Sequence, residues 1–475
     1  MKKEEHAHII GICGTAMASL AGMMKESGFR VTGSDANAYP PMSTQLEQLG
    51  IGIMKGYDPA HLNPAPDLVI IGNVCRRDNP EALETVSRGL PYYSMASFVE
   101  ERYLKGKHPV VVAGTHGKTT TTSMISWLLH SAGRKPSFLV GGVPLNFGLS
   151  YRLDSGPHFV IEGDEYDTAY FDKGPKFLHY RPMTAVITSI EFDHADIYRD
   201  FTHYRSAFDR FISLIPADGS LVASTDATVI DVASRAICRV YRYGGEDTGS
   251  VFSFSNQSFG HDASEFDLFR NGARLGRLRM QLPGLHNVMN AVAASGVGLL
   301  LGLDFGEIAA GLASFEGVAR RQQIKGVFSG VTVIDDFAHH PTAVHETIDS
   351  VRRKYFNGAG GGRLIAVFEP RSNTSRRNIF QQAYAGAFKG ADLAVISSPY
   401  SAGAINEAER FNHSKLASEL TAAGIRAESL PDAASIASFL AMEAKPGDVI
   451  LIMSNGSFDN LAARLAGLLG EGEKK

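Results

Sequence analysis

The chain of 475 residues is 44% hydrophobic and 20% charged, as globular proteins are, and it predicts about three domains because single hydrophobic cores stop growing near about 250–300 residues. Its net charge of −4 gives no electrostatic reason to expect nucleic acid or an anionic membrane as a partner, and no apolar run predicts membrane insertion. Three widely spaced cysteines exclude a disulfide framework and a zinc pattern, so we expect a cytoplasmic protein.

The first hundred residues alternate short apolar runs with helical stretches, which predicts a doubly wound parallel sheet. Its first strand runs into Gly11-Ile12-Cys13-Gly14-Thr15, which is similar to a dinucleotide-binding fingerprint without its middle glycine. Asp35 follows near the place of a ribose-binding acid. An NAD-dependent dehydrogenase would use these residues. The fingerprint is incomplete, however, and ordinary strand–helix packing explains it as well.

A second motif follows the apolar run Val110-Val111-Val112-Ala113. Here Gly114-Thr115-His116-Gly117-Lys118-Thr119-Thr120 precedes a stretch with helical spacing, so strand, glycine-rich turn and helix start occur in the order that a phosphate-binding loop requires. Lys118 supplies a positive charge and the Thr119 hydroxyl can ligate Mg²⁺. The chain is therefore predicted to bind a nucleoside triphosphate, in a second α/β unit that begins after Gly106.

Two further strands of this unit end in polar residues. Phe159-Val160-Ile161 leads into Glu162-Gly163-Asp164-Glu165, and Ala185-Val186-Ile187-Thr188 leads into Ser189-Ile190-Glu191-Phe192-Asp193-His194. A single carboxylate after a strand is usually a solvated loop acid or a helix cap. Ligands of parallel sheets bind at the carboxyl ends of the strands, so these two ends and the phosphate-binding loop together predict one phosphate and metal site.

Residues 245–281 carry phenylalanines among polar residues and predict strands at a sheet edge. An alanine-rich helix then begins, on which Asn287 and Asn290 share a face at i, i+3. An asparagine amide donates and accepts hydrogen bonds, which suits an adenine edge. Helix capping is the alternative, and we favour base binding for Asn290.

A third unit begins near Gly317-Val318-Ala319-Arg320-Arg321, and its apolar strands again end in polar or small residues. Arg320 and Arg321 would reach a phosphate when the domains close, unless they are simply linker arginines. Sheet domains on both sides of an ATP site suggest two substrates brought to one γ-phosphate, as in carboxylate activation by an ATP-driven ligase. We assign residues 1–106, 107–318 and 319–475 to the three domains.

Six motifs occur in order along the chain and together resemble the Mur ligase family of bacterial peptidoglycan synthesis: the phosphate-binding loop, Glu162-Gly163-Asp164-Glu165-Tyr166-Asp167, Asp193-His194, Gly284-Leu285-His286-Asn287-Val288-Met289-Asn290, Gly317-Val318-Ala319-Arg320-Arg321 and Asp335-Asp336-Phe337-Ala338-His339-His340-Pro341. The resemblance implies a three-domain α/β fold. A Rossmann-like UDP-sugar domain comes first, a P-loop ATPase domain is central, and a Rossmann-like peptide-binding domain comes last.

Three further stretches, 72–81, 166–177 and 368–377, resemble the members of the family that act in cell-wall recycling. Those enzymes use ATP and Mg²⁺ to join UDP-N-acetylmuramate to the tripeptide L-alanyl-γ-D-glutamyl-meso-diaminopimelate through an acyl phosphate. The alternative within the family is ligation of free L-alanine to the same sugar. From a different class, a nucleotide-sensing regulator would keep the P-loop without ligase chemistry. We expect a monomer or weak dimer.

The resemblance also implies roles for matching residues. Catalysis is expected from Lys118, Glu162, His194, Arg321 and, as general base, His339. ATP is expected to contact Gly114, Thr115, Gly117, Lys118, Thr119, Thr120, Asn290, Arg321 and Asp336, and Mg²⁺ to contact Thr119, Glu162 and His194. The UDP-sugar is expected to contact Gly11, Gly14, Thr15, Asp35, Asn73, His116 and Asn146, and the peptide to contact His339, His340, Arg371, Arg376 and Arg377.

Two positions complicate the transfer of these family roles to this chain. Mg²⁺ prefers oxygen ligands, so a bond to His194 would be chemically unusual. Several Mur ligases carry a carbamylated lysine about fifteen residues after this histidine, where the present chain has Phe208. Phosphate and metal stabilisation is then expected to depend on Lys118, Glu162, His194 and water.

Overall fold

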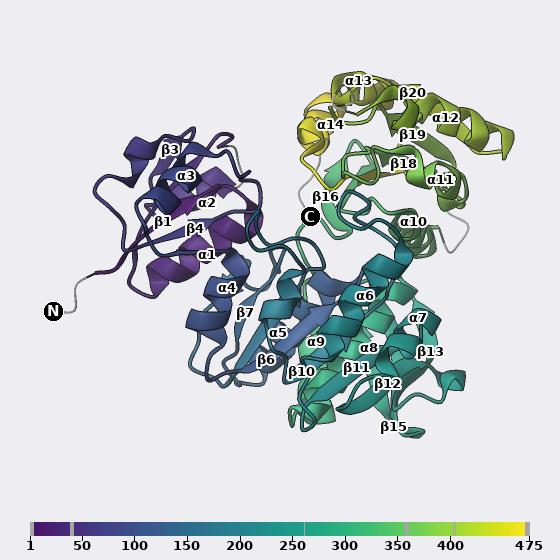
Figure 1. The fold of residues 1–475 in the computed structure, drawn as a ribbon. Coiled ribbons are helices and arrows are strands. Elements are labelled where there is room, and N and C mark those ends of the chain that lie inside the picture. The colour runs from purple at the N-terminus through teal and green to yellow at the C-terminus, as the bar shows by residue number, and fades with distance from the viewer. Residues whose placement is uncertain are drawn as a thin grey trace.

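The structure, a computed structural model, describes residues 4–38, 42–260, 262–356, 361–401, 403 and 405–470. They form three domains, each with its own sheet, and the first and last domains lie on different sides of the central one (Figure 1). Within the described ranges, no helix combines the length and the apolar character that a membrane span needs.

The N-terminal domain has a five-stranded sheet in the order β3-β2-β1-β4-β5, with every pairing parallel. β1 is buried along its whole length because it lies between β2 and β4. The doubly wound parallel sheet predicted for this region is confirmed. Its elements are β1 (His6–Ile10), α1 (Thr15–Glu26), β2 (Arg30–Asp35), α2 (Met42–Gln48), β3 (Ile53–Lys55), β4 (Leu68–Ile71), α3 (Pro80–Ser87), β5 (Tyr92–Tyr93) and α4 (Met95–Val99).

The central domain has a ten-stranded sheet in the order β15-β14-β13-β12-β11-β10-β6-β9-β7-β8. β6 lies between β9 and β10, all parallel, so the three strand ends predicted to form the site lie side by side. The edge strands predicted for residues 245–281 are confirmed as an antiparallel extension. The elements are β6 (His108–Ala113), α5 (Lys118–Ser131), β7 (Ser137–Leu139), β8 (Tyr151–Arg152), β9 (His158–Gly163), β10 (Thr184–Ile187), α6 (Phe201–Ile212), β11 (Ser220–Ser224), α7 (Ala227–Ala233), β12 (Arg239–Gly245), β13 (Phe252–Phe259), β14 (Ser264–Arg270), β15 (Ala273–Met280), α8 (Leu285–Leu300) and α9 (Phe305–Ala313).

The C-terminal domain has a six-stranded sheet in the order β16-β17-β21-β18-β19-β20, of which β16 alone pairs antiparallel. The four apolar strands expected in this unit are present, and β16 and β20 add the two edges. Its elements are β16 (Gln323–Phe328), β17 (Val331–Asp336), α10 (Pro341–Tyr355), β18 (Leu364–Phe368), α11 (Gln381–Ala387), β19 (Leu393–Ser397), α12 (His413–Ala422), β20 (Arg426–Leu430), α13 (Ala433–Glu443), β21 (Val449–Met453) and α14 (Leu461–Leu469). Each sheet falls within one predicted domain range, and the boundaries themselves stay a prediction.

The N-terminal and central domains share a hydrophobic core. One cluster of buried side chains continues from α1 and β1 into the central domain, where it includes Tyr151 and Phe177. Gly22 of α1 makes the close approach possible, because a Cβ there would lie 2.2 Å from the Tyr151 hydroxyl oxygen. Ser19 and Ser150 add a hydrogen bond of 2.6 Å across the same contact. The buried clusters of the C-terminal domain contain only residues of that domain.

The N-terminal domain contains a buried carboxylate, that of Glu81 on α3. It accepts hydrogen bonds from the Ser34 hydroxyl at 2.5 Å and the Asp58 backbone N–H at 3.0 Å, and it contacts the rings of His61 at 2.6 Å and His8 at 3.3 Å. Burial by itself raises the pKa of Glu81, but these donors outweigh burial and lower it. The network therefore stabilises the ionised carboxylate and ties α3 to β1 and β2.

Replacing Glu81 by leucine is expected to destabilise the protein by about 3–5 kcal/mol, because it leaves buried polar partners unsatisfied. Since the folded pKa of Glu81 lies below the ordinary value of 4.5, its contribution is present above that pH and is lost as the pH falls through the folded pKa. Urea unfolding at pH 7 and at pH 4 measures both effects. The control is Glu84→Gln, at a partly exposed position paired with Arg88 on the same helix, and it is expected to stay within about 0.5 kcal/mol of the parent. Equal stability of all three proteins would contradict this account.

Candidate active site

The turn between β6 and α5 requires glycine at both ends. Gly114 has φ +136°, and a Cβ there would lie 2.2 Å from the Thr188 hydroxyl oxygen. Gly117 has φ +81° and caps α5, and a Cβ there would lie 2.5 Å from Asn290 Oδ1. The turn therefore presents the N-terminus of α5, with its backbone N–H groups, to an anion. This is the local geometry of a phosphate-binding loop.

Lys118 opens α5, and its ammonium group is buried. Nζ donates to the Gly114 carbonyl at 2.6 Å and to Glu165 Oε2 at 2.7 Å. Burial by itself lowers the pKa of Lys118, but the carboxylates of Glu165, Asp164 and Glu162 outweigh it and raise the pKa. The lysine is therefore fully charged. Glu165 was part of the acidic motif but was not assigned a role from the sequence.

The hydroxyls of the turn are also engaged. Thr115 donates to the Glu191 carbonyl oxygen at 2.9 Å, and Thr120 is buried in the first turn of α5. Thr119 donates to Glu162 Oε1 at 2.8 Å, while the Gly141 backbone N–H donates to the other carboxylate oxygen at 2.7 Å. Thr119 and Glu162 thus place a hydroxyl oxygen and a carboxylate oxygen, both possible metal ligands, side by side at the end of the P-loop.

Mg²⁺ fits this pair by the chemistry of its donors, since it prefers hydroxyl, carboxylate and water oxygens. Burial, followed by the charge of Asp164, raises the pKa of Glu162. A cation beside Glu162 would favour its ionised form. Thr119 and Glu162 therefore fit Mg²⁺ by their chemistry, and their role as its ligands stays a prediction.

His194 is placed differently from the expected metal ligand. It has φ +53°, and its Nε2 lies 3.3 Å from Glu165 Oε1. Burial by itself lowers the pKa of His194, but Glu165 outweighs it and raises the pKa to about 9. A protonated imidazole has no lone pair for a metal. His194 as a ligand stays a prediction that requires loss of this proton.

A second buried lysine lies beside the same acidic group. Lys176 Nζ is 2.9 Å from Asp164 Oδ2 and 4.2 Å from the centre of the Tyr166 ring. Phe208, at the position of the carbamylated lysine of other Mur ligases, is fully buried among aromatic side chains. The lysine charges found at the site therefore come from Lys118 and Lys176, and Lys176 was not identified from the sequence.

The structure separates the two neighbouring arginines of the linker. Arg321 donates to Thr119 Oγ1 at 3.3 Å, and its guanidinium lies 4.9 Å from the centre of the Phe337 ring. Arg320 turns back into its own domain, where it donates to Asp335 Oδ2 at 3.2 Å and to the Ser454 carbonyl at 2.7 Å. Arg321 is therefore the C-terminal-domain cation that meets the P-loop.

The residues expected to bind the nucleoside lie near these groups. Asn290 is buried on α8 and accepts a hydrogen bond from Thr121 at 3.2 Å. Asp336, at the end of β17, accepts backbone N–H bonds from Gln322 and Ala338, both at 2.7 Å. Asp336 therefore shapes the loop that carries Arg321. Its contact with a ribose, and that of Asn290 with adenine, stay predictions.

Asp193, after β10, faces the two histidines of the C-terminal domain. His339 Nε2 lies 4.0 Å from Asp193 Oδ2, while His339 Nδ1 donates to the Phe337 carbonyl at 3.0 Å. This bond fixes the tautomer and leaves a lone pair on Nε2. Burial lowers the pKa of His339, and it lowers that of His340 to about 4. His339 thus has the neutral, basic nitrogen that a general base needs.

The residues expected to bind the UDP-sugar gather at one edge of the N-terminal sheet. Gly11, with φ +80°, follows β1, Gly14 and Thr15 begin α1, and Asn73 follows β4. Asp35 ends β2 and accepts the Cys13 and Asn37 backbone N–H groups, both at 2.9 Å. These are carboxyl ends of parallel strands, where ligands of such sheets bind.

Asn146 lies in the central domain and is held by the segment before the linker. Its amide donates to the Ser314 carbonyl at 2.8 Å and accepts the Glu316 backbone N–H at 2.9 Å. One N–H and one oxygen lone pair of the amide are left, so the contact of Asn146 with the sugar stays a prediction.

The expected peptide-binding arginines follow β18. Arg371 stacks on Tyr400, 3.8 Å from the ring centre, and Arg377 pairs with Glu409. Arg376 donates to the Asn373 side chain at 2.6 Å and to the Tyr400 carbonyl, and its Nε is buried without a hydrogen-bond partner. The contact of these arginines with a peptide stays a prediction.

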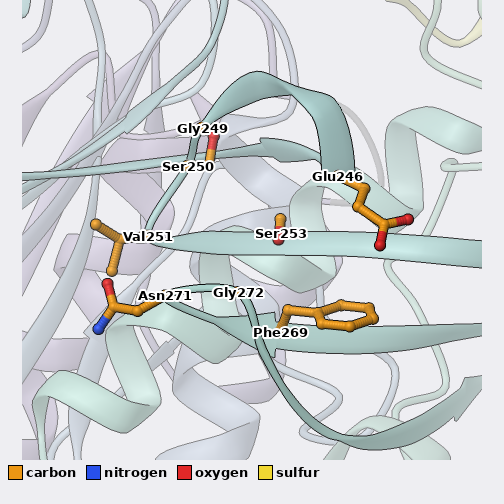
Figure 2. Close-up of a pocket in the computed structure, with 8 residues that line it drawn as sticks. All are labelled: Glu246, Gly249, Ser250, Val251, Ser253, Phe269, Asn271 and Gly272. Atoms are coloured by element: carbon orange, nitrogen blue, oxygen red, sulfur yellow. The ribbon is translucent and has the colours of Figure 1, made fainter.

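A pocket of about 330 Å³ lies elsewhere, where the segment before β13 meets the β14–β15 turn (Figure 2). Figure 2 shows Ser253 between Glu246 and Phe269, with Val251 and Asn271 on the opposite side. None of its eight lining residues is a predicted site residue. The pocket gives no support to a second catalytic centre.

Three family models match the chain in succession. They are the Mur ligase family catalytic domain over residues 6–103, the Mur ligase middle domain over 112–298, and the Mur ligase glutamate ligase domain over 320–456. Together they span each of the three sheets.

Relatives match over nearly the whole length. The UDP-N-acetylmuramate–L-alanyl-γ-D-glutamyl-meso-2,6-diaminoheptandioate ligase of Haemophilus influenzae is 37% identical, covering 97% of this chain and 98% of the relative. The UDP-N-acetylmuramate–L-alanine ligase of Acetivibrio thermocellus is 33% identical, covering 96% and 94%. The crystal structure of a murein peptide ligase from Psychrobacter arcticus has a TM-score of 0.74 at 36% identity, covering 99% of this chain and all of that one.

Proposed function

This chain belongs to the Mur ligase family, and we propose that it joins UDP-N-acetylmuramate to the tripeptide L-alanyl-γ-D-glutamyl-meso-diaminopimelate in peptidoglycan recycling. It is an ATP-dependent amide ligase. The observation that carries this proposal is the meeting of Lys118, Thr119 and Arg321, from two domains, beside the half-buried carboxylate of Glu162. That arrangement is suited to phosphoryl transfer, which depends on positioning and electrostatic stabilisation.

The reaction proceeds in two steps. The lactyl carboxylate of the sugar attacks the γ-phosphorus of ATP, which forms an acyl phosphate and releases ADP. The amine of the L-alanine residue then attacks the acyl carbon, phosphate leaves, and a proton passes from the amine to a base. His339 Nε2 is the base we propose, because it is neutral and carries a lone pair.

The residues of the P-loop act on the phosphates. Lys118 leaves Glu165 to contact the β- and γ-phosphoryl oxygens, and Arg321 approaches them from the C-terminal domain. Mg²⁺, which Thr119 and Glu162 would hold, supplies positive charge to the phosphoryl oxygens when it is bound. Glu165 retains His194 as its cationic partner, so its carboxylate is not left unpaired when Lys118 moves.

The UDP-sugar is proposed to bind at the N-terminal sheet edge and the peptide at Arg371, Arg376 and Arg377. Three arginines in this segment support an anionic peptide over free L-alanine, since guanidinium groups bind carboxylates in two-point fashion. We further propose that the protein acts in the cytoplasm as a monomer or weak dimer. The competing substrate is L-alanine, which the Acetivibrio relative is named for.

Phosphate release with ATP, Mg²⁺ and UDP-N-acetylmuramate tests the proposal, with the tripeptide compared against L-alanine. We expect kcat/KM for the tripeptide to be higher by at least about 100-fold, because two charge-assisted bonds to its carboxylates contribute about 1.5 kcal/mol or more each. Arg376→Met should raise KM for the tripeptide, while the exposed Arg464→Met control should not. Faster turnover with L-alanine would assign the alternative ligase activity. Nucleotide binding without release of phosphate from either mixture would point to a regulator.

A further inference from the structure

Three side chains from two domains face one another beside the P-loop. His116 follows β6, Glu191 follows β10, and His340 caps the start of α10 in the C-terminal domain. One metal-ligating atom of each lies within 4.8 Å of the others. Two imidazoles and one carboxylate form a donor set unlike the all-oxygen pair of Thr119 and Glu162.

The separations within this trio are those of ligands rather than of hydrogen-bonded partners. His116 Nε2 lies 3.4 Å from Glu191 Oε2, and His340 Nδ1 lies 3.7 Å from the same oxygen. A direct hydrogen bond would be about 2.7–3.2 Å long. Two ligands of a tetrahedral cation, each bound at about 2.0–2.1 Å, lie about 3.3–3.4 Å apart. The His116–Glu191 separation therefore matches that of two ligands of one small cation, and His340 Nδ1 needs to move about 0.3–0.4 Å closer to Glu191 to join them.

His340 is buried, whereas the side chains of His116 and Glu191 are 18% and 36% exposed. The side chain of His340 is 8% exposed, and Nε2 of both histidines is buried without a hydrogen-bond partner. The Thr342 backbone N–H donates to His340 Nδ1 at 3.3 Å, which shows that this nitrogen is unprotonated. Because Nδ1 has a single lone pair, a cation bound there would replace this hydrogen bond. The Thr342 hydroxyl donates to Glu191 Oε2 at 2.6 Å. Such a bond orients a ligating carboxylate in metal centres.

We propose that His116, Glu191 and His340 form a site for a borderline divalent cation such as Zn²⁺, which links the central domain to the C-terminal domain. Imidazole ligands favour Zn²⁺ or Co²⁺ over Mg²⁺, so this site is chemically distinct from that of the nucleotide-associated Mg²⁺. Two ligands come from the central domain and one from the C-terminal domain. The cation therefore binds the closed arrangement of the two domains and stabilises it.

Titration of the full chain with Co²⁺ tests the site. Bound metals are first removed with a chelator, and the titration is done in excess Mg²⁺ without nucleotide or other substrate. We expect one Co²⁺ per chain with the visible absorption of tetrahedral or five-coordinate Co²⁺, displaced by Zn²⁺. Glu191→Gln and His340→Asn should each weaken binding at least about tenfold, since even an outer-shell change costs about that much. His345→Asn, on the exposed face of the same helix, is the matched control.

Two results would overturn the proposal. The first is an absence of Co²⁺ absorption, or equal absorption by the parent, Glu191→Gln and His340→Asn. The second is loss of Co²⁺ binding in Glu162→Gln with retention in Glu191→Gln, which would place the cation at the P-loop. If a histidine variant does not fold, Thr342→Val tests the site independently. It removes only the hydroxyl that orients Glu191, and it should weaken Co²⁺ binding. Because substrates are absent, failure here leaves the ligase proposal untouched.

Discussion

Lys118→Met is expected to lower kcat for phosphate release by about 10²–10³-fold. The variant removes a cation that is buried and poised at the N-terminus of α5, and loss of one preorganised electrostatic contact to a developing charge costs about this much. Steady-state kinetics with the tripeptide and saturating ATP measure the effect. Turnover within about twofold of the parent would exclude Lys118 from the phosphate site.

The same substitution is expected to destabilise the resting protein by about 3 kcal/mol, because it leaves the buried carboxylate of Glu165 without its main partner. Breaking a buried ion pair costs about 3–5 kcal/mol, and the loss here lies at the lower end because His194 remains beside that carboxylate. Adding Glu165→Gln should restore most of the stability but none of the turnover, since a neutral amide needs no cation. Urea unfolding of the single and double variants separates the structural role of the pair from the catalytic role of the lysine.

Arg321→Ala is expected to lower kcat by about 10³-fold, the smaller end of what an arginine supplied to a transferring phosphoryl group contributes. Arg321 reaches Thr119 from the C-terminal domain, so its charge arrives only when the domains are together. Lysine at this position should recover part of the loss.

The neighbouring Arg320 offers a matched control, since it donates into its own domain. Arg320→Lys should lower the thermal stability and leave kcat within about threefold of the parent, because the Thr119 contact is untouched. A larger kcat loss for Arg320→Lys than for Arg321→Ala would reverse the two assignments.

The sequence alone predicted those elements whose structure depends on a local pattern of residues. The turn that contains Gly114 and Gly117 is encoded by adjacent residues, and its strand and helix are where the pattern predicts them. The two edge strands of the C-terminal sheet were missed because Gln323–Phe328 and Arg426–Leu430 have charged or polar residues where a central strand has an apolar run.

Side-chain partnerships were harder to predict because they depend on tertiary contacts. Nothing local distinguishes Arg320 from Arg321, and it is the positive φ of Arg320, +60°, that accompanies their divergence. Glu165 and Lys176 were given no individual role from the sequence, yet folding buries each beside an opposite charge. Asn146 has the polarity of a ligand-binding residue, but both ends of its amide bind the backbone near the linker.

The way the hydrophobic clusters are divided among the domains determines which domain can move. The N-terminal domain shares its buried cluster with the central domain, so pulling them apart would expose apolar surface to water. The C-terminal domain meets the P-loop side through polar bonds such as Thr342–Glu191 and Asn373–Asp196, each replaceable by water at a net cost of about 0.5–1.5 kcal/mol. The C-terminal domain can therefore swing as a rigid body about the 317–321 segment. Admission of substrates then becomes a hinge motion that leaves every hydrophobic core intact.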